Sequence, residues 1–125
     1  MSRELMSLVL PRMAQRLDRQ LRRYRAGELD DEQFTRKFEL LLQQQYDWLA
    51  RQGIEEVEAA VMIHGAVLVL SGAGLRAEAQ ELNLPLETVE YRAVRAAAAD
   101  VAETYGLKED RVFRRISAVV AAYAE

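Results

Sequence analysis

The chain has 125 residues, of which half are hydrophobic and 30% are charged, and its net charge is −3. This balance is typical of one globular domain that folds without disulfides or metals. The sequence contains no cysteine and a single histidine, so disulfides, thiolate metal centres and a multi-histidine metal site within one chain are excluded. We therefore expect no metal and no cofactor.

No segment of the sequence has the length of a membrane-spanning helix. The longest apolar stretch covers residues 59–70 and is interrupted by His64 and Gly65, whereas a bilayer requires about 20 residues. The first ten residues lack the apolar core and cleavage site of a secretion signal. We expect a cytoplasmic protein that does not bind membranes.

Charge is divided unevenly along the first half of the chain. Residues 1–26 contain seven arginines and two acids, and residues 27–60 contain nine acids and three basic residues. A basic segment followed by an acidic one indicates that the two lie against each other or face different partners.

The first two expected helices form an antiparallel hairpin over residues 1–52. The first spans residues 3–25, although Pro11 predicts either a kink or a start near Leu10. After Gly27, Asp30 and Gln33 have the spacing of a capping box, which predicts a second helix that ends at about Gln52.

Residues 54–125 are expected to form a C-terminal helical cluster. Its first helix runs to about Leu70 and is apolar on every face, a pattern that a buried strand would share, but no second strand is available to pair with it. We expect a loop over residues 71–74, then helices over 75–82, 85–105 and 109–124. The predicted fold is all-α, with five or six helices in a single domain and the long N-terminal hairpin packed on the C-terminal cluster.

The sequence contains no recognisable catalytic pattern, which favours a protein that is not an enzyme. His64 is interpreted as a core histidine bonded to a backbone carbonyl or a hydroxyl, with a buried pH sensor or cofactor contact as the alternative. Glu55 and Glu58 do not have the Glu-x-x-His spacing of a di-metal bundle. Ser71 stands in Ser-Gly-Ala-Gly, which lacks both the nucleophile-elbow pattern and the lysine of a phosphate loop. No small-molecule substrate is indicated.

Four arginines of the first helix follow one another at spacings of four, three and four residues: Arg12, Arg16, Arg19 and Arg23. This spacing places them on one helix face, which we expect to lie opposite the apolar stripe. Such a face could follow nucleic-acid phosphates, pair with acids of a partner or of the second helix, or simply be solvated.

Residues 77–95 resemble a helix-turn-helix, the DNA-reading unit of bacterial repressors and of the last domain of sigma factors. Ala79 matches the small residue of the first helix, Asn83 stands at the turn, and Leu84, Thr88 and Val89 match the apolar and paired positions that follow. The resemblance implies DNA binding, with Arg92 and Arg95 near the phosphates.

The same segment departs from the motif at several positions. Glu78 and Arg92 replace residues that are normally apolar, and no basic residue would face the DNA groove. The residues that would face it are Pro85, Leu86, Glu87, Glu90 and Tyr91. Two carboxylates there would meet acceptor-rich base edges.

The sequence thus favours a non-catalytic helical interaction module, with a nucleic-acid-binding regulator as the alternative. Surplus apolar surface predicts a homo-oligomer or another protein partner. The candidate interface residues are Met6, Leu10, Met13, Leu17 and Tyr123.

Overall fold

The computed structural model describes the backbone of residues 3–124 and the side chains of residues 11–123. Within this range the chain forms six α-helices and no strand, so the predicted all-α fold is confirmed. The chain divides into two compact units, Met1–Ala59 and Ala60–Glu125. The division between them falls inside the third helix.

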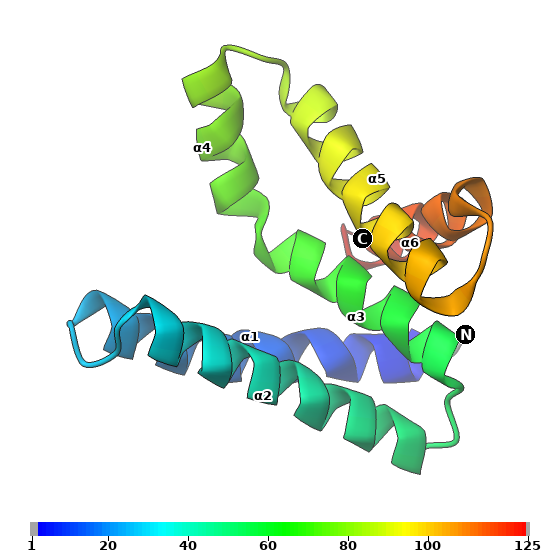
Figure 1. Ribbon diagram of the computed structural model, residues 1–125, viewed down its shortest axis with the longest axis horizontal. Coiled ribbons are helices and arrows are strands. Elements are labelled where there is room, and N and C mark those ends of the chain that lie inside the picture. Colours follow the sequence, from blue (N-terminus) through cyan, green and yellow to red (C-terminus); the bar gives the residue numbers. More distant parts are fainter. Residues whose placement is uncertain (1–2, 125) are drawn as a thin grey trace. The chain divides into compact units, whose positions relative to one another are not determined.

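The first unit is built on an antiparallel hairpin of α1 (Arg3–Arg25) and α2 (Asp31–Arg51), which lie side by side in Figure 1. Pro11 lies inside α1, so the alternative start near Leu10 is wrong. A proline at this position removes one backbone hydrogen bond. The loss of this hydrogen bond affects one turn, and α1 extends on both sides of Pro11.

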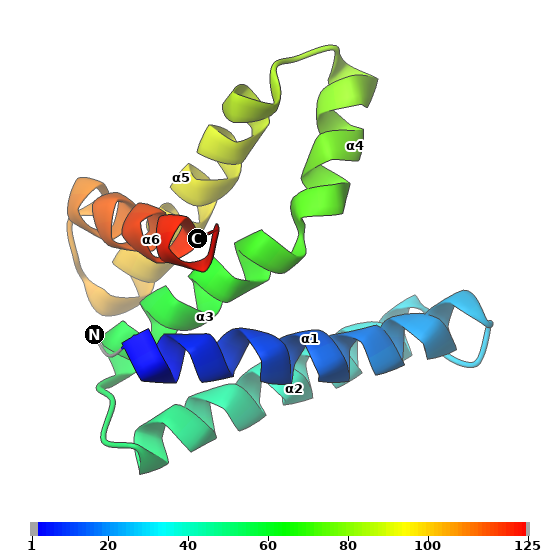
Figure 2. The same ribbon diagram turned by 180° about the vertical axis from the view of Figure 1, so that it is seen from behind.

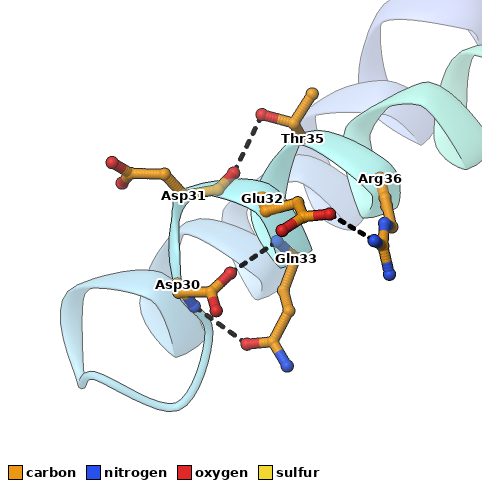
Figure 3. A network of polar contacts seen from close by, with 6 residues as sticks. All are labelled: Asp30, Asp31, Glu32, Gln33, Thr35 and Arg36. Carbon is orange, nitrogen blue, oxygen red and sulfur yellow. Dashed lines mark hydrogen bonds and ion pairs between the residues drawn. The ribbon is translucent and has the colours of Figure 1, made fainter.

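A capping box starts α2, as its sequence predicts (Figure 3). The Asp30 carboxylate accepts a hydrogen bond from the Gln33 backbone N–H at 2.7 Å, and the Gln33 side-chain oxygen accepts one from the Asp30 N–H at 2.9 Å. Two N–H groups that would lack partners at a helix start are thereby satisfied. Glu32, in the first turn of α2, forms an ion pair with Arg36.

Aromatic contacts close the hairpin beside this cap. The rings of Tyr24 and Phe34 stack with centroids 5.0 Å apart, and the Tyr24 hydroxyl donates a hydrogen bond to Asp31. Leu29, in the turn, is buried. These contacts fix the turn from both helices and set the register of the hairpin.

The buried side chains of α2 follow one stripe: Leu41, Gln45 and Leu49. Gln45 has no exposed surface, and neither its side-chain oxygen nor its nitrogen has a hydrogen-bond partner. A buried amide without partners costs about 1–3 kcal/mol, so the core of this unit contains a destabilising polar group.

The apolar third segment is α3 (Glu56–Leu70), so the preference for helix over strand is confirmed. Val61, Met62 and Ile63 are consecutive in the chain and are all buried. Three consecutive residues of a helix point in different directions, so α3 is enclosed on more than one side, as its uniform hydropathy predicts.

The predicted loop over residues 71–74 is wrong, because α4 (Gly72–Leu82) begins directly after Ser71. The Ser71 carbonyl accepts the first hydrogen bond of α4, from the Leu75 N–H at 3.0 Å. The Ser71 hydroxyl donates back to the Val67 carbonyl at 2.8 Å and does not cap α4. One residue therefore makes the turn.

Among the described helices none is by itself long and apolar enough to span a membrane, although α3 and α4 together reach that composition across a 60° bend.

The second unit continues with α5 (Leu86–Tyr105) and α6 (Glu109–Ala124). Asn83 ends α4 in the left-handed conformation, with φ of 53°. Figure 2 shows α6 crossing α5, and these two helices make the most extensive packing within the unit. Their buried residues are Val89, Ala98, Val101, Ala102, Val112, Ile116 and Val119.

Candidate functional site

The arginine stripe of α1 lies along the seam with α2. The Arg12 guanidinium is 4.9 Å from the ring centroid of Trp48, and Arg16 donates a hydrogen bond to the Gln44 side chain at 2.7 Å. Both partners belong to α2. The expectation that the stripe lies opposite the packed face is therefore wrong for Arg12 and Arg16, which contact α2.

The other two arginines of the stripe differ in their surroundings. Arg23 contacts the Glu28 carboxylate at 3.4 Å, across the turn after α1. Arg19 is exposed and has no hydrogen bond or ion pair within the described part of the chain. The stripe is thus not a uniform row of free cations. Of its four arginines, Arg19 is the one whose guanidinium has no partner among the described residues.

The helix-turn-helix-like segment has the predicted helix–turn–helix course in α4 and α5. Ala79 and Val89 are buried, as the motif requires, and Asn83 makes the turn. Glu87 and Glu90 are exposed on the second helix. The surface at the start of α5 is therefore acidic, which is unfavourable next to phosphates.

Arg95, which the motif would place near DNA, is engaged inside the second unit. Its guanidinium lies 3.9 Å from the Phe113 ring centroid and donates to Asp110 at 2.8 Å and to the Tyr91 hydroxyl at 3.0 Å. The hydrogen bonds to Tyr91 and Asp110 raise the pKa of Arg95 above its ordinary value. Arg95 thus joins α5 to α6, whereas Arg92 is exposed on α5.

His64 has two partners in the second unit. Its Nδ1 lies 2.8 Å from the Ala60 carbonyl oxygen, which agrees with the predicted backbone partner. Its Nε2 lies 3.5 Å from the Asp100 carboxylate, and 28% of the histidine side chain is exposed. Asp100 was not predicted as a partner of His64, because the two residues are far apart in the chain. No group of three or more metal-ligating side chains occurs among the described residues.

The candidate interface residues differ in burial, and none of those with described side chains is fully exposed. Met13 has no exposed surface and lies in the core, while Leu17 is half-buried. The side chains of Met6 and Leu10 lie outside the described residues. Tyr123 is half-buried with a hydroxyl that has no hydrogen-bond partner, and burial raises its pKa to about 12.

A groove in the second unit was not anticipated from the sequence. It has a volume of about 280 Å³, and apolar side chains from all four helices of the unit line it. They are Leu68, Val69, Leu75, Leu86, Val94 and Val120. Two charged residues, Arg76 on α4 and Glu90 on α5, also line the groove.

No protein-family model, curated protein or solved structure matches this chain.

Proposed function

We propose that this protein is a non-catalytic helical interaction module that forms a homodimer through the α4–α5 groove. The observation that supports the proposal is the groove itself, whose six apolar lining residues are all half-buried in the single chain. A second copy that covers them would remove apolar surface from water, which stabilises association. We also propose the cytoplasmic location expected from the sequence.

The two charged residues of the groove favour a second copy as its occupant. Arg76 and Glu90 have opposite charges, both are exposed, and neither has a polar partner among the described residues. In a two-fold interface each contact occurs twice, so Arg76 of each copy can pair with Glu90 of the other. A self-complementary pair of this kind fits an identical partner.

Further apolar surface lies on the same two helices. Leu82, at the end of α4, and Tyr91, on α5, are 51% and 53% exposed. Only Ala79 of α4 is buried. A helix with so little burial is stabilised further when another surface covers it.

The test is a charge-reversal cycle read out by sedimentation equilibrium. Arg76→Glu and Glu90→Arg should each weaken the dimer, by about tenfold or more, because each places like charges opposite one another. The double variant Arg76→Glu/Glu90→Arg should restore association. Thermal unfolding of each variant separates loss of association from loss of folding.

Matched controls come from the same helices outside the groove lining. Arg92→Glu and Glu81→Arg reverse exposed charges on α5 and α4 and should leave the dimer intact. A strictly monomeric wild-type chain at high concentration would contradict the proposal. Equal effects of the groove and control variants would do so as well.

Nucleic-acid binding is the second candidate, and the helix–turn–helix course of α4 and α5 favours it. The free cation of the segment is Arg92, since Arg95 is engaged with Asp110. Titration of a duplex at low and moderate salt tests this function, because phosphate contacts predict affinity that falls steeply with salt. Absence of binding at low salt would eliminate it.

A further inference from the structure

A second hollow, of about 230 Å³, opens between α1 and α2 in the first unit. Its lining contains three cationic side chains and no acidic one. The lining residues are Arg16, Arg19, Gln20, Lys37, Leu40, Leu41 and Gln44. The hollow belongs wholly to the first unit, so it is independent of the groove proposed for dimerisation.

The three cations of this hollow are not neutralised by carboxylates. Arg16 is held by its hydrogen bond to Gln44, a neutral side chain, at 2.7 Å. Arg19 and Lys37 have neither a hydrogen bond nor an ion pair within the described residues, and both are exposed. Three positive charges around one concavity repel one another, and an anion between them would relieve this repulsion.

A neutral residue of the hollow, Gln20, restricts which anions can bind there. The Gln20 side-chain oxygen is buried and has no hydrogen-bond partner, so it requires a donor. Inorganic phosphate keeps a P–OH group at neutral pH and so supplies both negative charge and a donor. A small monoester is mainly a dianion at that pH and would donate through a hydroxyl of its substituent, whereas sulfate has acceptors only. Guanidinium groups bind phosphate oxygens in a bidentate way, and lysine adds a point charge.

The size of the hollow indicates a small ligand. Pockets for drug-sized ligands have volumes of about 300–1,000 Å³, and this hollow is below that range. Leu41, at its wall, is buried, whereas Leu40 is 53% exposed. A phosphate group with at most a short substituent fits this volume.

We propose that the α1–α2 hollow binds phosphate, free or as the monoester of a small molecule, through Arg16, Arg19 and Lys37, with Gln20 accepting a hydrogen bond from it. Nucleic acids and acidic peptides are different ligands. Each would need an extended surface, and the stripe does not supply one because Arg12 and Arg23 are engaged with Trp48 and Glu28.

The test is an NMR titration of the wild-type chain with inorganic phosphate at constant ionic strength, using arginine side-chain N–H and glutamine amide signals. We expect saturable shifts confined to the residues of the hollow, and weaker binding of sulfate. A parallel titration with glycerol 2-phosphate distinguishes the two sources: tighter binding than phosphate indicates a monoester, and weaker binding indicates the free ion.

The variant Arg19→Gln/Lys37→Gln should weaken phosphate binding by about tenfold or more. Both residues are exposed and unengaged, so the fold should be retained, which circular dichroism checks. The control is Arg22→Gln/Arg36→Gln, which removes the same charge from the same two helices outside the hollow. It should leave phosphate binding unchanged.

Several outcomes would overturn the proposal. They are the absence of saturable shifts, equal binding of sulfate, and equal loss of binding in the control variant. Binding of a short DNA duplex or a hexaglutamate peptide through these residues without binding of phosphate would also overturn it. These results do not depend on the oligomeric state, so they are distinguishable from failure of the dimer proposal.

Discussion

Tyr123 lies near the end of α6 with its hydroxyl buried and without a hydrogen-bond partner. Burial opposes the charged phenolate and raises the pKa of this group from 10.0 to about 12. In the unfolded chain the same group ionises at the lower value. The contribution of Tyr123 to folding is therefore fully present below pH 10 and is lost as the pH rises from 10 to about 12.

We expect Tyr123→Phe to keep or raise stability at neutral pH, by up to about 1 kcal/mol, because it removes an unsatisfied hydroxyl. The variant should also lose less stability than the wild type above pH 10. Urea unfolding at neutral and alkaline pH measures both effects. Equal alkaline losses in the two proteins would show that Tyr123 ionisation does not limit alkaline stability.

Gly65 allows α3 and α6 to approach closely. A Cβ built on Gly65 would overlap Cγ1 of Val119 and lie 3.0 Å from its Cβ. We expect Gly65→Ala to lower the free energy of unfolding by about 1–2 kcal/mol, because overpacking outweighs the better helix propensity of alanine. Chemical denaturation measures the change.

Gly74 offers a matched control for this substitution. A Cβ there has no atom within 4 Å, so Gly74→Ala should be neutral or stabilise by up to about 1 kcal/mol. The double variant Gly65→Ala/Val119→Ala should recover part of the loss, since it removes the overlapping atoms. A Gly65→Ala protein as stable as the wild type would contradict the close approach.

At the scale of one element, the start of α2 depends on the capping box. Asp30→Ala leaves the Gln33 N–H without its acceptor and should cost about 1 kcal/mol. Asp30→Asn keeps a side-chain oxygen at the same place and should cost only a few tenths. Thermal and urea unfolding compare the three proteins, and an equal loss in both variants would assign the effect to charge and not to capping.

The two helices α4 and α5 differ in how much of their surface is packed within the second unit. α5 is joined to α6 through buried residues and through Arg95, which contacts Asp110 and Phe113. α4 buries only Ala79 and has a half-exposed Leu82. We therefore expect that, of the helices in the second unit, α4 is stabilised most when a partner covers it.

For the whole molecule, the dimer proposal predicts that stability depends on protein concentration. Association that favours the folded state raises the unfolding midpoint by mass action. Over a hundredfold increase in concentration we expect a rise of about 5 °C for a chain of this size. Calorimetry measures the midpoint, and Arg76→Glu should abolish the dependence. A constant wild-type midpoint across the range in which dimers form would contradict the proposal.

Local signals in the sequence predict the helices and most of their ends. The signals at these ends are local: Asp30 and Gln33 bond within one turn, and Asn83 takes up its left-handed conformation without distant partners. A loop was wrongly predicted over residues 71–74, because small residues are compatible with either a loop or a helix. In the structure the Ser71 carbonyl accepts a hydrogen bond from the Leu75 N–H, which starts the helix. The uniform hydropathy of residues 59–70 likewise indicated that α3 is enclosed.

Which helix faces meet follows from the packing of the helices and not from any local signal. Periodicity shows which residues share a helix face but not which face packs against the next helix, so Arg12 and Arg16 were expected opposite the apolar face although they contact α2. For the same reason His64 and Asp100, the α4–α5 groove and the α1–α2 hollow could not be foreseen. Each of these features contains residues from separate helices. Helix packing brings these residues together, and no local pattern in the sequence indicates that they are close.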